Sequence, residues 1–357
     1  MQKLKILIVK TSALGDVIQC FPALDFLRRQ FPSATIDWVV EKPFAELLHA
    51  NPHINHVYEV ETKKWKKAPF RIQSFKQVCK AFKSLRESSY DLVIDLQGNI
   101  KSGLITLVVK GKEKVGFSRA CAPEWPNTLF TSFRVEVDLA SPVSSQYLTL
   151  AAAFFSKQPV ERISQVELMI SKEEEEWIQK QLSGVKERPI MVCMGSNWEN
   201  KKLSLSTWQA FLQKVQDKYS STFFFVWGSE KEREEVEELH QSISGTSFVL
   251  PRMILPVWQR MMGHMEIILS VDSSALHLAA TTSSLTYSFF GPSSAEVYNP
   301  SGASHGTLQG SCPYEVKFTK RCPKLRTCAT GACLKNFTAE EIFEQFSTWA
   351  QENGGFV

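Results

Sequence analysis

The sequence predicts an α/β protein built from two domains, each with a parallel β-sheet. Short apolar runs recur along the chain, and a segment with helical periodicity follows each of them, which is the order of elements that parallel sheets with right-handed crossovers require. The 357 residues suffice for two ordinary domains. With 43% apolar and 22% charged residues, the composition is that of a globular protein and excludes a disordered or collagen-like chain.

The first half opens on an apolar strand at residues 4–9. A short polar turn leads from it into a helix whose apolar face carries Val17, Phe21, Leu24 and Leu27. The same order returns at residues 36–49 and 92–109, where an apolar run again precedes a segment with helical period. These three units predict the first parallel sheet.

The second half repeats this organisation after a polar, charged stretch between about residues 160 and 185. Strands are expected at residues 189–193, 222–227, 266–271 and 285–290, and helices at 229–240 and 273–280. After the first of these strands, Ser206 and Gln209 form a capping-box pattern beside an apolar face with Trp208, Phe211 and Val215. We expect an N-terminal domain at 1–170, a C-terminal domain at 171–335, and a final helix within 336–357 that packs back on the N-terminal domain.

The net charge of +4 is distributed unevenly. Residues 1–140 hold 21 Lys and Arg against 14 Asp and Glu, giving +7, whereas residues 141–357 hold 20 against 23, giving −3. The densest basic run is Lys63-Lys64-Trp65-Lys66-Lys67, which suits a polyanionic partner such as a phosphorylated lipid, with a solvated surface as the alternative. A nucleic-acid interface needs basic and aromatic residues interleaved along a groove, so one cluster argues against it.

Membrane-spanning and secretory signals are not predicted. No stretch approaches the roughly 20 uninterrupted apolar residues that span a bilayer, and the first apolar run is too short for a signal peptide. We therefore expect a cytosolic protein, with contact at a membrane surface as its only membrane association. Eight cysteines then predict reduced thiols. Cys312, Cys322, Cys328 and Cys333 lack the paired Cys-x2-Cys spacing of structural zinc sites, so thiols are favoured over a metal site.

Polar residues that follow the predicted strands are the candidate ligand groups, because open parallel sheets bind ligands at the carboxyl ends of their strands. The chain contains no Gly-x-Gly-x-x-Gly, no Gly-x-x-x-x-Gly-Lys-Ser/Thr and no Asp-x-Asp. A bound diphosphate would therefore be neutralised by side chains and helix termini. In the first domain, two carboxylates are candidate general bases: Asp16 at the start of the first helix, beyond the carboxyl end of the first strand, and Asp95 at the end of another strand. The alternative for Asp16 is a carboxylate that only favours the helix dipole.

Three strand-end loops of the second domain offer groups suited to a nucleotide diphosphate sugar. Each also has a structural explanation: a polar loop for the first, a Ser-x-x-Glu cap for Glu232, an N-cap for Asp272 and a core histidine for His277. The convergence of the three loops favours the binding interpretation. The candidates are Ser196, Asn197 and Lys201 after the first strand, Glu232 after the second, and Asp272, Ser273, Ser274 and His277 after the third.

Several motifs occur in a characteristic order along the chain. The first is the segment Ile6-Leu7-Ile8-Val9-Lys10-Thr11-Ser12-Ala13-Leu14-Gly15-Asp16-Val17, followed by Phe21-Pro22-Ala23-Leu24. The later ones are Asp95-Leu96-Gln97-Gly98, Trp227-Gly228, Ser270-Val271-Asp272-Ser273-Ser274-Ala275-Leu276-His277 and Phe290-Gly291-Pro292-Ser293. Together they resemble the lipopolysaccharide heptosyltransferases, glycosyltransferase family nine, and the resemblance covers essentially the whole chain.

The resemblance implies a GT-B fold, in which two Rossmann-like domains face an interdomain cleft. It implies metal-independent, inverting transfer of heptose from ADP-heptose to the Kdo or heptose inner core of lipopolysaccharide, at the cytoplasmic face of the inner membrane. Asp16 matches the family's proposed base, and Ser196, Asn197, Lys201, Glu232 and Asp272 match its donor-binding positions.

The acceptor-binding positions implied by the resemblance are Lys63, Lys64, Lys66 and Lys67 in the basic run. Pro123 stands where an acceptor-binding Arg is expected, and Arg119 is taken as its substitute. Asn197 replaces a hydroxyl residue, and Ser273-Ser274 stands in place of Thr-Gly. Another sugar or acceptor within the family, a GT-B-like nucleotide-sugar epimerase, and a non-catalytic binding protein are the alternative functions.

Overall fold

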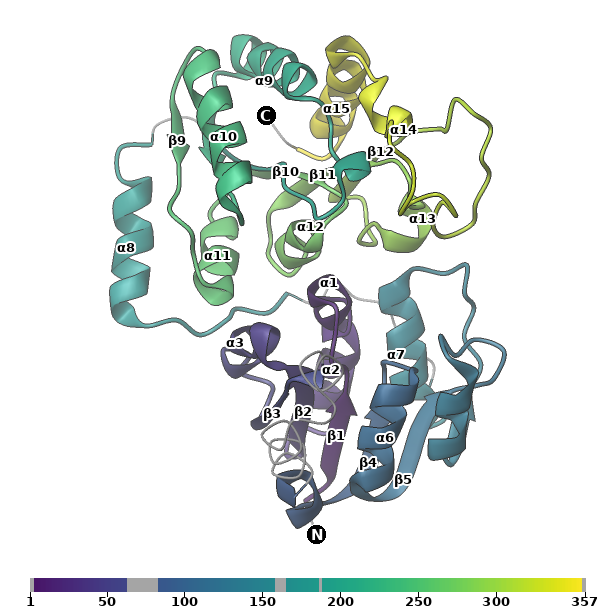
Figure 1. Ribbon diagram of the computed structural model, residues 1–357. Coiled ribbons are helices and arrows are strands. Elements are labelled where there is room, and N and C mark those ends of the chain that lie inside the picture. Colours follow the sequence, from purple (N-terminus) through teal and green to yellow (C-terminus); the bar gives the residue numbers. More distant parts are fainter. Residues whose placement is uncertain (1–2, 63–82, 158–164, 186–187, 355–357) are drawn as a thin grey trace. The chain divides into compact units, whose positions relative to one another are not determined.

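A computed structural model of the chain describes residues 3–62, 83–157, 165–185 and 188–354 (Figure 1). The chain divides into two compact units, Met1–Ser164 and Gln165–Val357. In the ranges that the structure describes, no helix is long and apolar enough to cross a membrane. The basic run at residues 63–67 lies outside these ranges.

The first unit contains a six-stranded sheet in the order β3-β2-β1-β4-β5-β6, in which every neighbouring pair is parallel. The strands are β1 (Lys5–Val9), β2 (Thr35–Glu41), β3 (His56–Val60), β4 (Ser89–Asp95), β5 (Lys110–Phe117) and β6 (Phe133–Val135). The two central strands, β1 and β4, are almost entirely buried, which explains their continuous apolar runs.

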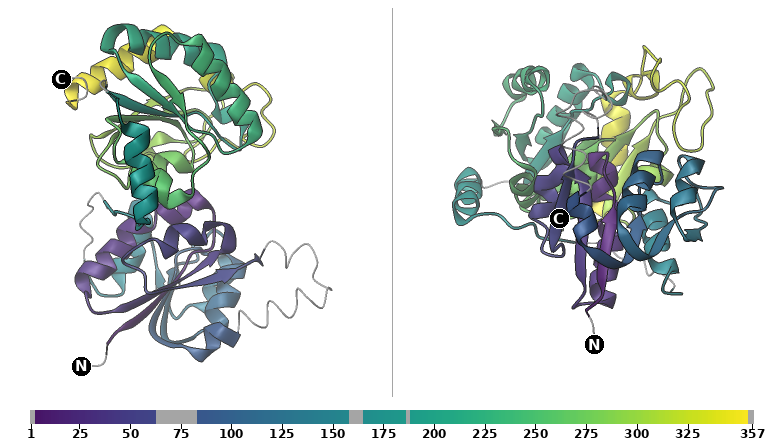
Figure 2. Two further views of the ribbon diagram at one scale, coloured as in Figure 1. Left: turned by 90° about the vertical axis from the view of Figure 1, so that its left-hand side faces the viewer. Right: turned by 60° about the horizontal axis from the view of Figure 1, so that its bottom comes forward.

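Helices cover both faces of this sheet, with α2 on one face and α6 on the other (Figure 2). The described helices are α1 (Leu14–Ile18), α2 (Phe21–Gln30), η1 (Lys42–Phe44), α3 (Ala45–His49), α6 (Ile100–Val108), η2 (Trp125–Phe130) and α7 (Val143–Ala153). The single opening helix that we expected is interrupted between α1 and α2. Pro22 explains the second start, because proline has no N–H to donate and fits the first turn of a helix.

The second unit contains another six-stranded parallel sheet, in the order β12-β11-β10-β7-β8-β9. Its strands are β7 (Pro189–Cys193), β8 (Thr222–Phe225), β9 (Ser247–Val249), β10 (Ile267–Val271), β11 (Leu285–Phe290) and β12 (His305–Gln309). The α/β class with two parallel sheets, predicted from the alternation of strands and helices, is confirmed.

Helix α9 occupies the place where the second half predicts its first helix. Its N-cap is Ser204, whose Oγ accepts from the Thr207 N–H at 3.1 Å, so our expected start at Ser206 was two residues late. The described helices of this unit are α8 (Lys172–Leu182), η3 (Glu199–Lys201), α9 (Leu205–Tyr219), α10 (Glu230–Ser242), α11 (Leu255–Met262), α12 (Ser274–Ala279), α13 (Ala295–Tyr298), α14 (Ala332–Lys335) and α15 (Ala339–Glu352).

The C-terminal helix α15 belongs to the second unit, where it packs against α9 and β12. The final helix that we expected within 336–357 therefore has its core contacts in the second unit. The reason is its apolar face: Ile342, Phe346 and Ala350 are fully buried in the core of the second sheet. Phe346 packs edge-on against Phe211 of α9, with ring centroids 5.4 Å apart.

Candidate functional site

Asp16 lies in α1, directly after the loop that leaves the carboxyl end of β1. It is half-buried, and its Oδ2 accepts a hydrogen bond from the Ala13 N–H at 3.1 Å. The carboxylate therefore ties the start of α1 to the preceding loop. Both interpretations of Asp16 share this placement: it supports the helix terminus, and it lies at the sheet edge where ligands of parallel α/β folds bind.

The loop before Asp16 is held by Gln97, a residue that our sequence analysis did not single out. Gln97 Oε1 accepts three hydrogen bonds, from the Thr11 N–H at 3.1 Å, the Thr11 hydroxyl at 3.3 Å and the Ser12 N–H at 3.0 Å. Gln97 reaches this loop because Val9 is paired with Asp95 in neighbouring strands, so the residues that follow the two strands lie side by side.

Lys10 is a buried residue at the same edge of the sheet, where it links β1 to the residues that follow β4 and to α7. Its ammonium is buried and donates to the Leu96 carbonyl at 3.2 Å and to the Tyr147 hydroxyl at 2.6 Å, and it lies 4.3 Å from the centroid of the Tyr147 ring. The sequence does contain a signal for this role of Lys10: a lysine directly follows the apolar run of β1, and a charge next to a buried strand usually has a partner.

Asp95, the competing candidate base, is instead a buried structural residue. It is fully buried, and its carboxylate accepts from the N–H groups of Gln97 and Gly98, from the Ser102 hydroxyl and from the Asn127 amide at 2.7–3.0 Å. Burial raises the pKa of Asp95, and these donors oppose the rise. A carboxylate so enclosed cannot approach an acceptor hydroxyl, and its role is to fix the β4–α6 loop that carries Gln97.

In the second unit, the three predicted loops leave the carboxyl ends of β10, β7 and β8, which are neighbours in the sheet. Lys201 follows β7, and Asp272 follows β10. Their side chains meet: Lys201 Nζ lies 2.5 Å from Asp272 Oδ2, and both side chains are almost inaccessible to solvent. The Ser293 hydroxyl also donates to Asp272 Oδ2. Ser293 was part of the motif comparison but not one of our predicted site residues.

The charge state of Asp272 follows from these contacts. Burial by itself would raise the pKa of the carboxyl group, but Lys201, the Ser293 hydroxyl and the nearby His277 together hold it below its ordinary value. Asp272 is therefore a buried carboxylate with a lysine partner at the edge of the sheet. It is not the N-cap of α12, because Ser273 occupies that position and its Oγ accepts from the Ala275 N–H at 3.3 Å.

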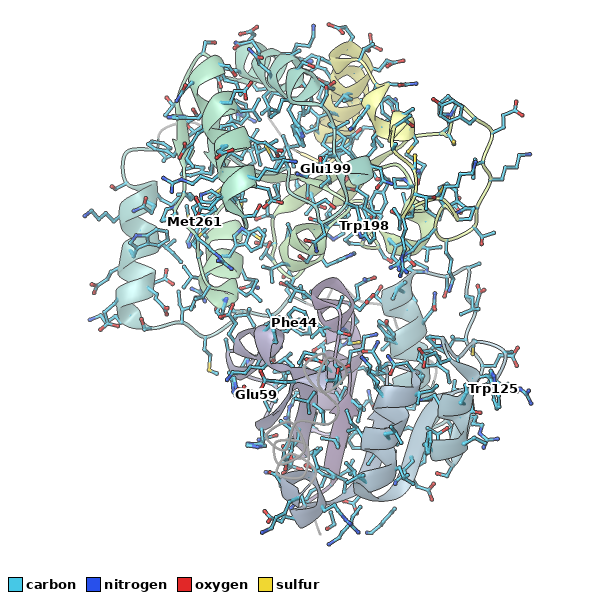
Figure 3. The ribbon with its side chains drawn as sticks, viewed as in Figure 1. Phe44, Glu59, Trp125, Trp198, Glu199 and Met261 are labelled. Carbon is cyan, nitrogen blue, oxygen red and sulfur yellow. The ribbon has the colours of Figure 1, made fainter. Side chains whose placement is uncertain are left out.

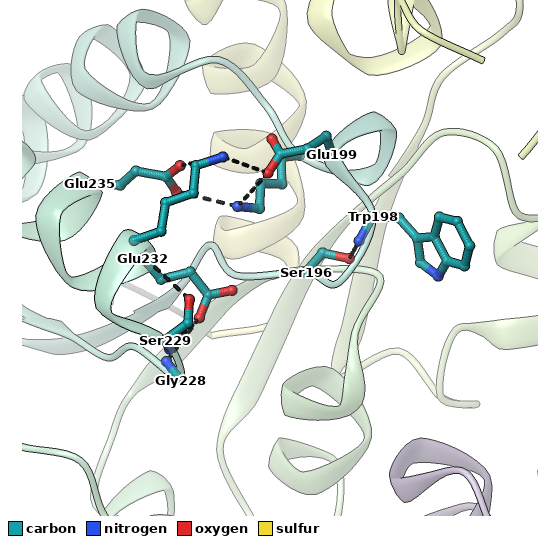
Figure 4. A network of polar contacts seen from close by, with 9 residues as sticks. Ser196, Trp198, Glu199, Gly228, Ser229, Glu232 and Glu235 are labelled. Carbon is teal, nitrogen blue, oxygen red and sulfur yellow. Dashed lines mark hydrogen bonds and ion pairs between the residues drawn. The ribbon is translucent and has the colours of Figure 1, made fainter. Parts of the chain in front are cut away.

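Glu232 connects the β8 loop to the β7 loop. Its Oε2 accepts from the N–H groups of Gly228 and Ser229 at 2.9 and 3.1 Å, and Ser229 completes the capping box of α10 (Figure 4). The predicted Ser-x-x-Glu cap is thus confirmed. The carboxylate also lies against Gly195, where an added Cβ would come within 2.5 Å of Glu232 Oε1, so a larger residue at this position would displace the carboxylate.

A second polar network beside this loop was missed by the sequence analysis. The buried Lys202 lies 3.4 Å from Glu199 and 3.3 Å from Glu235, and Lys231 bridges the same two carboxylates (Figure 4). Lys202 is therefore a buried lysine with two carboxylate partners. It anchors the 196–202 loop to α10, and Trp198 of that loop projects away from the network (Figure 4).

The remaining predicted donor residues lie on the same three loops. Ser196 Oγ accepts from the Trp198 N–H at 3.3 Å, and Asn197 is exposed. Ser274 is half-buried at the first turn of α12, whereas His277 is buried within that helix. The predicted donor group therefore lies along one edge of the second sheet, with Ser196, Asn197 and Ser274 as its more accessible members.

Of the predicted acceptor residues, only Arg119 lies within the described ranges. It is exposed, and its guanidinium lies 4.8 Å from the centroid of the Trp125 ring. Lys63, Lys64, Lys66 and Lys67 lie outside those ranges.

Cys312, Cys322, Cys328 and Cys333 are half-buried free thiols. Burial, together with the neighbouring thiols, raises the pKa of Cys333 to about 11. Within the described part of the chain, no three or more His, Cys, Asp or Glu side chains are grouped so that they could hold a metal ion.

Comparison with solved structures defines the class of the fold. An E. coli heptosyltransferase WaaC with ADP matches with a TM-score of 0.80 at 22% identity, over 97% of this chain and 100% of that chain. A second WaaC structure, with ADP-2-deoxy-2-fluoro heptose, matches with a TM-score of 0.78 at 22% identity, over 98% and 100%. The two parallel units are thus those of a GT-B glycosyltransferase fold.

Sequence comparison gives the family. The model of glycosyltransferase family 9 (heptosyltransferase) matches residues 78–327, well over half of the chain. Lipopolysaccharide heptosyltransferase 1 of Pseudomonas aeruginosa is 28% identical over 89% of this chain and 87% of its own length, and the protein of that name from Escherichia coli K12 is 25% identical over 81% and 88%. The chain belongs to glycosyltransferase family 9 and is a glycosyltransferase, as the resemblance implied.

Proposed function

We propose that this glycosyltransferase transfers a heptose from ADP-heptose to the Kdo-bearing inner core of lipopolysaccharide. The observation that carries the proposal is the likeness to lipopolysaccharide heptosyltransferase 1 over nearly the whole of both chains. It is supported by the fold shared with a structure that holds ADP-2-deoxy-2-fluoro heptose. We further propose that transfer inverts the anomeric carbon, needs no metal, and occurs where the enzyme contacts the cytoplasmic face of the inner membrane.

Asp16 is the proposed general base. It would remove the proton of the acceptor hydroxyl while the anomeric carbon gains oxocarbenium character and ADP leaves. General-base assistance contributes roughly 10²–10⁴-fold in rate. Two contacts support this assignment: the Ala13 N–H holds Asp16 Oδ2, and Gln97 holds the loop from which the base projects. Both restrict the directions in which the carboxylate can point, as a positioned base requires.

Lys201 is the proposed cation for the diphosphate. Its ammonium already donates to Asp272, but an ammonium has three N–H donors, so it can hold Asp272 and a phosphate oxygen together. Pairing with Asp272 keeps the lysine at the strand edge in the absence of ligand. Ser196, Asn197, Ser273 and Ser274 would add neutral donors, and together these groups would stabilise the charge that develops on departing ADP.

Glu232 and Asp272 are the proposed contacts to the ribose and to the transferred sugar. Glu232 caps α10 through one carboxylate oxygen, and its other oxygen lies beside Gly195 at the end of β7. A cap and a ribose contact are therefore compatible in one residue. His277, which is as buried as Asp272 and contributes to the low pKa of that carboxylate, would act at the donor beside it.

The proposal is tested by incubating the protein with ADP-heptose and measuring both ADP release and the glycosylated product. The acceptors are Kdo-bearing lipid A, an already heptosylated core, and no acceptor. We expect product with the first acceptor, unchanged in excess EDTA, with the inverted anomeric configuration by NMR. Conversion of the donor without any acceptor would instead indicate an epimerase, and saturable binding without turnover would indicate a binding protein.

A further inference from the structure

Five apolar side chains of the first unit are exposed on two neighbouring elements, and we call them the α6–η2 face. Twelve large apolar side chains are exposed among the described residues, and five of the twelve lie on these two short elements. Single exposed apolar residues scattered over a surface are ordinary, whereas such a cluster indicates an interaction surface. Their exposed fractions are 43% for Ile100, 45% for Leu104 and 55% for Leu107 in α6, and 53% for Trp125 and 68% for Leu129 in η2.

These side chains form one continuous surface because η2 packs directly against α6. An added Cβ on Gly103 would come within 2.4 Å of the Phe130 ring, so glycine lets η2 approach closely. At about 100° per residue, Ile100, Leu104 and Leu107 all lie within about 100° of Gly103, on one side of it. The apolar stripe of α6 therefore borders η2.

The same surface reaches the carboxyl edge of the first sheet. The Ile100 N–H donates to Glu124 Oε2 at 2.8 Å, and the Glu124 N–H donates to the Gly98 carbonyl at 3.1 Å. Trp125 follows directly and lies at the outer margin of the unit (Figure 3). Arg119, a proposed acceptor contact, stacks on this tryptophan.

The charges around the face are predominantly basic. Residues 97–134 contain six Lys and Arg against two Glu, so this stretch alone carries +4, the same as the net charge of the whole chain. Lys101, Lys110, Arg119 and Arg134 are exposed, whereas the exposed Lys112 pairs with Asp91 at 2.7 Å. An apolar surface that contains a tryptophan and is bordered by cations is complementary to an anionic lipid surface, where aromatic rings lie at the headgroup level and lysine and arginine meet the phosphates.

We propose that the α6–η2 face is the surface by which the protein binds an anionic phospholipid bilayer. This inference rests on the proposed function, because an acceptor anchored in the bilayer by lipid A has to be met at the bilayer surface. Insertion of the five side chains to the headgroup level would bring Arg119 and the β4 edge close to the membrane plane. The face would then present the enzyme to an acceptor whose sugars project from the same plane.

The test is co-sedimentation of the full chain with vesicles of phosphatidylcholine alone or with phosphatidylglycerol, without any substrate. We expect binding to the anionic vesicles that weakens in high salt. Leu107→Glu/Leu129→Glu should reduce the partition coefficient by about tenfold or more, because it removes two inserted groups and adds two like charges at an anionic surface. Met169→Glu/Ile254→Glu, which changes two exposed apolar residues of the second unit, should bind like the wild type.

Three outcomes would overturn the inference. They are equal vesicle binding by the two double variants, equal binding of the wild type to neutral and anionic vesicles, or a change of oligomeric state as the only effect of Leu107→Glu/Leu129→Glu. Circular dichroism and transfer to a water-soluble, deacylated acceptor are measured in parallel. Both should be unchanged in Leu107→Glu/Leu129→Glu, since neither residue lies among the proposed donor or catalytic groups. Failure of the wild type on the deacylated acceptor would count against the proposed function, whereas vesicle binding tests the surface independently.

Discussion

Replacing Lys201 by methionine should destabilise the second unit through Asp272, and the loss should grow as pH rises. The structure provides the magnitude. The side chains of Lys201 and Asp272 are only 11% and 8% exposed and form an ion pair at 2.5 Å. Removal of one partner from such a pair leaves a buried charge and costs about 3–5 kcal/mol. For a unit of this size each kcal/mol lowers Tm by about 2–4 °C, so a decrease of about 6–20 °C is expected.

The pH dependence follows from the direction of each pKa shift. In the wild type, the folded-state pKa of Asp272 is low, so its contribution to stability is present above its ordinary pKa and is lost as pH falls through the folded value. Without Lys201, burial dominates and the pKa rises above the ordinary value. The variant should then lose stability as pH rises above about 4, the ordinary pKa of an aspartate.

Differential scanning calorimetry of the full chain between about pH 4.5 and 7.5 would measure this loss of stability. The pH range begins just above the ordinary pKa of an aspartate. Lys201→Met/Asp272→Asn should recover most of the loss, because no charge is then left unpaired. The control is Lys214→Met, which breaks the exposed pair with Glu340 and should cost at most about 1 kcal/mol. A Lys201→Met decrease no larger than the control, or one that stays constant with pH, would refute the reasoning.

Three further predictions separate positioning, capping and metal effects. Gln97→Ala should lower kcat by about 10–100-fold with donor KM unchanged, because the N–H groups of Thr11 and Ser12 in the loop before Asp16 lose their acceptor. Gln97→Glu, which keeps an acceptor oxygen, should restore much of the lost kcat. Steady-state kinetics would measure both effects, and an unaltered pH profile would support a positioning role for Gln97. Ser229→Ala should lower the free energy of unfolding, measured with denaturant, by about 1 kcal/mol and leave donor KM unchanged, whereas Glu232→Gln should raise donor KM. Equal effects of the two changes on donor KM would show that Glu232 only caps α10. Transfer in excess EDTA should match the untreated rate, and recovery only on adding a divalent ion would contradict metal independence.

The strands could be predicted from sequence because parallel strands buried on both faces are continuous apolar runs. The central strands β1, β7, β10 and β11 lie where such runs were found. The C-terminal helix could not be assigned to a domain, because an amphipathic pattern indicates that a face is buried without indicating against what. Only the structure places Phe346 in the second core.

The contacts between candidate residues were less predictable than their positions. Lys201 and Asp272 are 71 residues apart, and their pairing depends on β10 lying beside β7, an order that the sequence leaves open. Gln97 reaches Thr11 and Ser12 for the same reason, through the register of β4 on β1. Asp95 shows the converse: its strand-end position suggested a base, but burial against Ser102 and Asn127 makes it structural.

The most direct test of the account compares Asp16→Asn with the wild type in single-turnover transfer from ADP-heptose to Kdo-bearing lipid A, with ADP affinity measured by calorimetry on the same samples. Asp25→Asn is the matched control, because this carboxylate lies in the neighbouring helix α2 and pairs with Arg29 at 2.8 Å. The account predicts a rate about 10²–10⁴-fold lower for Asp16→Asn, with unchanged ADP affinity and a normal control. Transfer by Asp16→Asn at close to the wild-type rate would contradict it.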